Sequence, residues 1–152
     1  MSAFFDTNVV VYGFDRGAPL KQEQALALLS DHMSAGTAVF STQVLQETYV
    51  TLTRKQALAP ADALEVVRAL SQERIIGSSA EFVVRALTLS QKRRLSAWDA
   101  LVIQAALDAG CTTLYSEDLQ HGVRIDELRI VNPFALEAHE SPATPRSARA
   151  QR

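Results

Sequence analysis

Cysteine, basic charge and long apolar runs are all scarce in this sequence. Only one of the 152 residues, Cys111, is a cysteine, so no disulfide can form within the chain. With three histidines beside it, a zinc site of the usual ligand spacing is not expected. The formal net charge of -2 excludes a broadly basic surface that coats nucleic acid, so any such contact must be local.

No apolar run approaches the ~20 residues that cross a bilayer, and the start of the chain lacks the features of a signal peptide. These absences predict a cytoplasmic protein with no membrane contact. The composition, 47% hydrophobic and 21% charged, is that of one globular domain, which we expect over residues 1–138. Residues 139–152 are rich in Ser, Pro, Ala and Arg, so they predict a flexible tail.

The periodicity of apolar residues alternates between the patterns of strands and helices along the chain. Short strands are expected at residues 3–5, 37–41, 75–76, 112–115 and 128–131. Helices are expected at residues 20–35, from 42, from 60, at 80–89 and at 101–109. This order predicts an α/β fold of three layers, α/β/α, with a central parallel sheet, in which ligands bind at the carboxyl ends of the strands.

Three aspartates follow expected strands or begin an expected helix, and so they point toward one edge of the sheet. Asp6 and Asp118 follow strands, Asp99 lies in a first helical turn, and Glu47 could join them from its own helix. Carboxylates held together repel one another unless cations neutralise them, and Mg²⁺ prefers such oxygen ligands. Because a bound metal also activates water, the cluster predicts hydrolysis of phosphodiesters.

Each of these acids also has a structural interpretation. Asp6 could be a turn residue, and Asp99 could complete a capping box that begins at Ser96. Glu47 on a helix is by default a solvated surface residue, and Glu117 is as good a candidate as its neighbour Asp118. Residue patterns alone leave these alternatives open.

Four motifs that follow one another along the chain favour the functional interpretation of these acids. They are Phe5 to Asn8, Gln46-Glu47, Ser96 to Leu101 and Tyr115 to Leu119. With their spacing across an alternating domain, from about Ser2 to Phe134, the sequence resembles PIN-domain proteins, particularly VapC-type toxins. The resemblance implies a Mg²⁺-dependent endoribonuclease, with Mn²⁺ as a possible substitute. It implies metal-binding and catalytic roles for Asp6, Glu47, Asp99 and Asp118, whose carboxylates would be held in place by hydrogen bonds from Asn8 and Ser116.

The resemblance also implies partners, namely an RNA substrate, a VapB-like antitoxin and a second copy in a homodimer. Exposed apolar residues between Leu20 and Leu70 could form such interfaces, although each is expected to face its own core first. Arg93 and Arg94 could contact RNA phosphates, with a solvated loop as the alternative. Trp98 could stack on a base, but beside a helix start it is expected to be packed.

Other functional classes fit the sequence less well. A haloacid-dehalogenase-like phosphatase needs a second Asp two residues after the first, where this chain has Asn8, which cannot transfer a proton. A response-regulator receiver needs a phosphoacceptor Asp after the third strand, where Ile75-Ile76 leads into Gly77-Ser78. A PIN-like module that binds RNA or protein without cutting remains the main alternative.

Overall fold

A computed structural model describes residues 1–135 of the chain, so the expected boundary at residue 138 and the tail at 139–152 lie outside the described residues. The strands are β1 (Ala3–Phe5), β2 (Ala38–Ser41), β3 (Arg74–Ile76), β4 (Thr113–Tyr115), β5 (Arg124–Ile125) and β6 (Leu128–Val131). The helices are α1 (Thr7–Tyr12), α2 (Pro19–Ala35), α3 (Thr42–Arg54), α4 (Pro60–Leu70), α5 (Ala80–Arg93) and α6 (Ala97–Asp108).

The strands form one sheet in the order β3-β2-β1-β4-β6-β5. All neighbouring strands pair in parallel except β5, which is antiparallel to β6. The expected parallel sheet is therefore confirmed for four of the five strand pairings, and β5 is an edge strand that the sequence did not indicate.

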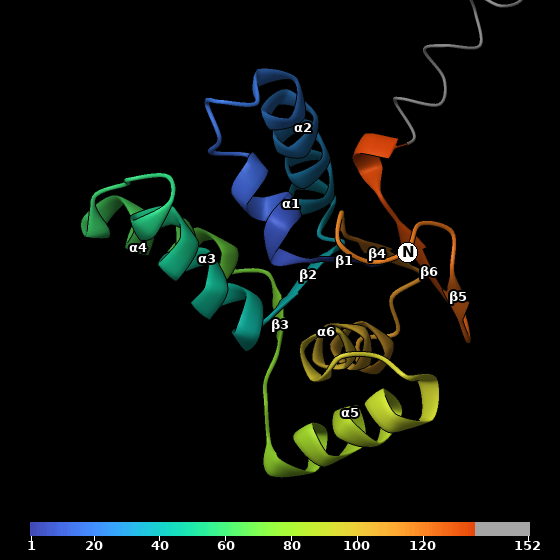
Figure 1. The fold of residues 1–152 in the computed structure, drawn as a ribbon. Helices are drawn as coiled ribbons and strands as arrows, with labels where there is room; N and C mark the ends of the chain where they lie inside the picture. The colour runs from blue at the N-terminus through green and yellow to red at the C-terminus, as the bar shows by residue number, and fades with distance from the viewer. Residues whose placement is uncertain (136–152) are drawn as a thin grey trace, which may run out of the picture.

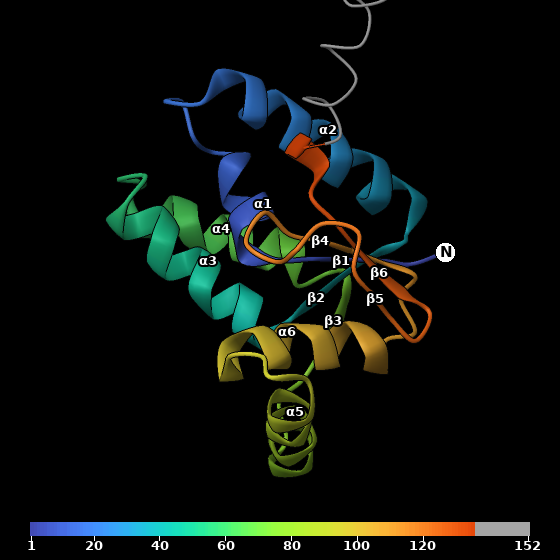
Figure 2. The ribbon, with the colours of Figure 1, turned by 45° about the vertical axis from the view of Figure 1, so that its right-hand side comes forward.

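Helices cover both faces of this sheet, as the alternating pattern predicted. In Figures 1 and 2, α1 and α2 lie on one face, while α6 lies on the other with α5 packed outside it. The helix pair α3 and α4 packs beside α1 next to the β2–β3 side. The central strands are buried on both faces, and Phe4, Phe5 and Phe40 are fully enclosed. The fold is the three-layer α/β/α arrangement.

One expectation for the segment after the first strand is wrong. The run Asp6-Thr7-Asn8 is typical of a turn and predicts a loop after the first strand, but Thr7 and Asn8 already belong to helix α1, and the Asp6 side chain accepts a hydrogen bond from the Thr7 amide. Val9, Val10 and Val11 are all buried in this helix. Their packing offsets the low helix propensity of β-branched residues, which is why the local sequence did not indicate a helix.

Two other helices extend beyond their expected limits. Helix α5 runs on to Arg93 and ends at Arg94, whose φ of 58° is left-handed. Helix α6 begins at Ala97 rather than residue 101, and Ser96 caps it by accepting a hydrogen bond from the Asp99 amide. Within residues 1–135, none of the helices combines the length and the apolar character needed to cross a membrane.

Candidate active site

The strand order places a topological switch at β1. From β1 the chain moves outward through β2 to β3, and it then returns to β4 on the other side of β1. The loops that leave β1 and β4 therefore lie side by side at the carboxyl edge, and the crevice beside this switch point is the usual ligand position in such sheets. The Asp6 amide, which donates to the Tyr115 carbonyl at 3.0 Å, ties the two loops together there.

Asp6 is the acid with the largest number of hydrogen bonds in the crevice. Its Oδ1 accepts from the Thr7 amide at 2.8 Å, and its Oδ2 accepts from the Ser116 hydroxyl at 2.8 Å and from the Asn8 side-chain amide at 3.3 Å. Ser116 is fully buried, and its oxygen in turn accepts from the Asp118 and Leu119 amides. The hydrogen bonds expected of Asn8 and Ser116 are therefore present.

Burial raises the pKa of Asp6 from its ordinary 3.8 to about 6. The hydrogen bonds from Ser116 and Thr7 lower this pKa, and the negative charges of Glu47 and Asp118 raise it. The net rise means that the surroundings do not fully balance a charge on Asp6. A cation in the crevice would supply the missing balance.

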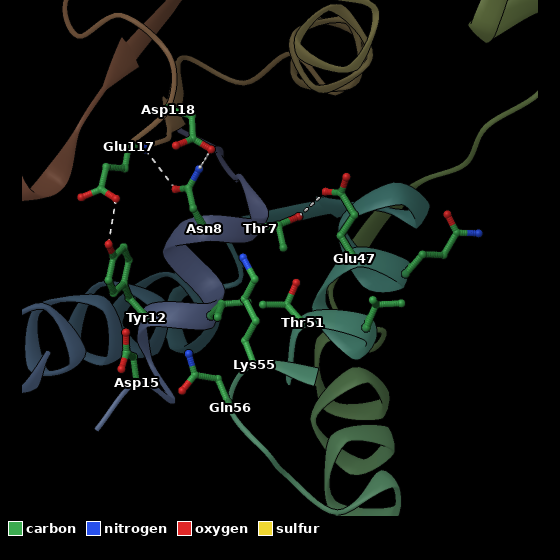
Figure 3. Close-up of a pocket in the computed structure, with 13 residues that line it drawn as sticks. Thr7, Asn8, Tyr12, Asp15, Glu47, Thr51, Lys55, Gln56, Glu117 and Asp118 are labelled. Atoms are coloured by element: carbon green, nitrogen blue, oxygen red, sulfur yellow. Dashed lines mark hydrogen bonds between the residues drawn. The ribbon is translucent and has the colours of Figure 1, made fainter. Parts of the chain in front are cut away.

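Glu47 comes to the same crevice from the second turn of α3, which begins directly after β2. Its Oε1 accepts from the Thr7 hydroxyl at 2.7 Å, and its Oε2 accepts from the side-chain amide of Gln43 at 3.3 Å (Figure 3 shows the first bond). Sequence reasoning did not single out Thr7 or Gln43. The signal available was the position of Thr7 inside the Asp-Thr-Asn motif and of Gln43 one helical turn before Glu47.

The structure separates the neighbouring acids Glu117 and Asp118. The Glu117 carboxylate accepts from the Tyr12 hydroxyl at 2.9 Å and forms an ion pair with Lys21. The Asp118 carboxylate instead accepts from the Asn8 amide at 3.1 Å, and Figure 3 shows the two acids turned to different sides. Asp118 therefore joins the crevice, while Glu117 has a cationic partner of its own.

Asp99 lies in the first turn of α6, on the opposite wall of the crevice. A cavity of about 160 Å³ is lined by Asp6, Glu47, Asp99 and Asp118, together with side chains that include Asn8, Gln43 and Trp98. All four predicted acids thus meet in one cavity from four separate segments of the chain. Arg93 and Arg94, at the C-terminal end of α5, do not line this cavity.

Trp98 is not packed, contrary to the expectation from sequence, because 68% of its surface is exposed. Residues 102 and 105 follow it on the same stripe of α6 and are buried. One turn earlier, Trp98 instead lines the acid cavity, where most of its surface stays exposed.

The donor set of the cavity fits a hard divalent cation. Within residues 1–135, no Lys, Arg or His forms an ion pair with any of the four acids. In the same part of the chain, no three acidic, His or Cys side chains converge closely enough to ligate one ion directly. The site therefore fits an ion held by one or two carboxylates with water in its other positions, as is common for Mg²⁺.

A larger pocket of about 600 Å³ opens beside the acids, between α1 and α3. Thr7, Asn8, Glu47 and Asp118 line both this pocket and the acid cavity. Lys55, at the end of α3, points into the pocket in Figure 3 and has no ion-pair partner among residues 1–135. Sequence reasoning missed Lys55, because only the fold brings it near the acids.

Several solved structures share this fold. A chain of a toxin-antitoxin complex from Klebsiella pneumoniae has a TM-score of 0.63 and 22% identity, covering 87% of this chain and 98% of its own. The sarcin-ricin loop cleaving toxin VapC20 of Mycobacterium tuberculosis has a TM-score of 0.60 and 21% identity, covering 77% of this chain and 90% of its own.

A chain of the DNA-bound VapBC complex from Salmonella typhimurium has a TM-score of 0.62 and 18% identity, and covers 88% of this chain and 98% of its own. No curated protein sequence gives a significant match. The model of the PIN domain family matches residues 3–125, a span that includes Asp6, Glu47, Asp99 and Asp118. The chain therefore belongs to the PIN domain family.

Proposed function

We propose that this protein is a metal-dependent endoribonuclease with Asp6, Glu47, Asp99 and Asp118 as its active-site acids. The observation that carries the proposal is that all four line one cavity at the sheet's switch point, without a cationic partner in the described residues. Mg²⁺ is the proposed cofactor and Mn²⁺ a substitute, because both are hard cations that take oxygen ligands.

The roles of the residues follow from their contacts. Asp6 and Asp99 are proposed as the principal metal ligands, with Glu47 helping to hold the metal or orienting water and Asp118 acting directly or through water. Ser116 and Asn8 hold the Asp6 and Asp118 carboxylates in place through the hydrogen bonds described above. A divalent metal held there would activate water and neutralise charge on the phosphate.

Asp99→Asn tests this proposal against Asp62→Asn, because both residues are acids in the first turn of a helix. Asp62 is exposed on α4 and does not line the acid cavity. With single-stranded RNA and Mg²⁺ or Mn²⁺, we expect the wild type and Asp62→Asn to cut. Asp99→Asn should be at least ~100-fold slower, and EDTA should stop all cutting, as read from fragments on a gel.

Two results would contradict the nuclease. The first is a wild type that fails to cut RNA with either Mg²⁺ or Mn²⁺ and shows no metal binding by calorimetry. The function would then be that of a binding module. The second is an Asp99→Asn variant that keeps its fold by circular dichroism and cuts RNA as fast as the wild type. The proposed role of the acids in the reaction would then be wrong. The phosphatase alternative has little support, because Asn8 uses its amide to donate to Asp118 and its oxygen to accept from the Glu117 amide.

We further propose that the chain is the toxin of a type II toxin-antitoxin pair. Similarity to chains of the Klebsiella and Salmonella complexes supports an antitoxin partner. We also propose that the chain forms a homodimer. Exposed apolar side chains on α2, α3 and α4 offer surfaces for both: Leu20, Leu26, Tyr49, Val50 and Leu64.

Expression of the chain alone should stop bacterial growth, and co-expression of a small protein encoded beside it should restore growth. Asp99→Asn should be harmless when expressed alone, since it keeps the surface but loses the proposed activity. Light scattering on the purified protein measures the homodimer separately. If cells grow normally while they contain active wild-type nuclease, the toxin proposal is wrong and the nuclease proposal stands.

A further inference from the structure

Trp98 has no role in the fold or among the acids, yet it stands at the rim of their cavity. It is the only tryptophan of the chain, and 68% of its surface is exposed. A large aromatic side chain normally gains free energy by leaving water, so its exposure beside a proposed active site indicates a binding partner.

Trp98 also lines a second cavity, of about 520 Å³, which we name the Trp98 cavity. Its apolar wall includes Ile76, Phe82 and Leu101, from the end of β3, from α5 and from α6. Among residues 1–135, no charged side chain lines it. A cavity of this size, within the usual ~300 to 1,000 Å³ of ligand sites, can take a flat uncharged ring system.

Side-chain amides, together with the hydroxyls of Ser41, Thr42 and Ser78, supply the polar part of the same cavity. Gln43 and Gln46, both in the first turns of α3, line it, and Gln46 is exposed. An amide offers both a donor and an acceptor, which is the pattern presented by the edges of nucleobases. An aromatic face with neighbouring amides therefore matches a base better than it matches an aliphatic group.

The Trp98 cavity adjoins the acid cavity. Trp98 and Gln43 line both, and Gln43 also donates to the Glu47 carboxylate. The pocket with Lys55 also adjoins the acid cavity, because Thr7, Asn8, Glu47 and Asp118 line both. A single strand could thus cross the acids with a base at Trp98 and a phosphate near Lys55.

We propose that the Trp98 cavity receives an unpaired base of the RNA next to the cut phosphodiester, stacked on the Trp98 ring. This inference rests on the proposed nuclease function and specifies its substrate class. A base inside a duplex is already stacked on its neighbours, so the cavity selects single-stranded segments or loops whose bases can turn outward.

Trp98→Ala and Trp98→Phe test the stacking on an unpaired oligoribonucleotide in Mg²⁺. We expect Trp98→Ala to lower kcat/KM by about 10- to 100-fold, mainly through KM, because stacking on an aromatic ring contributes at this level. Trp98→Phe should retain most of the activity, since it keeps an aromatic face. Val84→Ala is the matched control, because Val84 is also exposed (64%) but lines neither cavity. All three variants should unfold at the wild-type temperature.

Fluorescence gives an independent readout, because all tryptophan emission comes from Trp98. In stopped flow with Mg²⁺, mixing wild type with the oligoribonucleotide should quench this emission before products form. An abasic strand of equal length should not quench it, since it keeps the phosphates but has no ring to stack.

The outcomes separate this inference from the function on which it rests. If the wild type cuts, but Trp98→Ala is equally fast and the emission does not change, stacking is wrong, the nuclease stands, and a protein partner becomes the candidate occupant. If the wild type neither cuts nor changes its emission with RNA, the nuclease proposal fails and this inference fails with it.

Discussion

Replacing Asp6 with Asn should abolish RNA cutting and, at the same time, stabilise the metal-free protein. Cutting should fall by about 1,000-fold, because a metal ligand contributes several kcal/mol of stabilisation to the developing charge. Stability at neutral pH should rise by about 1 to 3 kcal/mol, because Asn carries no charge in a site that does not favour one. A residue needed only for the fold would not show these opposite effects.

The gain in stability should depend on pH in a defined direction. The pKa of Asp6 is about 6 in the folded protein and near 3.8 in the unfolded chain, so the folded protein binds this proton more tightly. The stabilisation by the proton is fully present below pH 3.8 and is lost as the pH rises through about 6. The difference between these pKa values corresponds to about 3 kcal/mol, at about 1.36 kcal/mol per pH unit.

Asp6→Asn and wild type should therefore unfold alike near pH 4 and differ most at neutral pH, by thermal or urea denaturation in EDTA. Added Mg²⁺ should raise the unfolding temperature of the wild type, because a ligand that binds only the folded state stabilises it, and should not raise that of Asp6→Asn. Asp62→Asn controls for the loss of an exposed charge. A variant less stable than wild type at neutral pH would mean that the lost hydrogen bonds outweigh the charge.

The sequence predicted the sheet because the strands β1, β2, β4 and β6 are short apolar runs bounded by turn residues. It failed at α1 and β5 for different reasons. In α1 the buried contacts of three valines override their local preference, and only the tertiary structure supplies those contacts. Strand β5 has two residues and turns into β6 through Asp126, whose φ of 53° is unusual outside glycine, so no sequence signal marks the turn.

In the candidate site, too, the features set by local sequence could be predicted, and those set by distant residues could not. Asp6 and Asp99 were predictable because their places, after a strand and at a helix start, follow from local pattern and the topology of the sheet. The distinction between Glu117 and Asp118 was not, because it depends on Lys21, which lies 96 positions away in the sequence. Likewise, the exposure of Trp98 depends on which parts of the fold surround the first turn of α6, which residue types do not reveal.

The pair Asp118→Asn and Glu117→Gln tests that distinction directly, since each variant replaces a carboxylate with its amide at adjacent positions. Asp118→Asn should cut RNA about 10- to 100-fold more slowly with little change in stability, because an Asn oxygen can still accept from Asn8. Glu117→Gln should cut within about 3-fold of wild type, because it lies outside the acid cavity.

Glu117→Gln should instead lower the free energy of unfolding. Its carboxylate pairs with Lys21, whose ammonium also lies 4.7 Å from the centre of the Tyr12 ring, and both side chains are partly exposed. Breaking such a pair should cost no more than about 1 kcal/mol, measured by urea denaturation. The reverse pattern, with Glu117→Gln inactive and Asp118→Asn active, would make Glu117 the fourth acid. It would also require Glu117 to leave Lys21 and turn toward Asn8 when RNA binds.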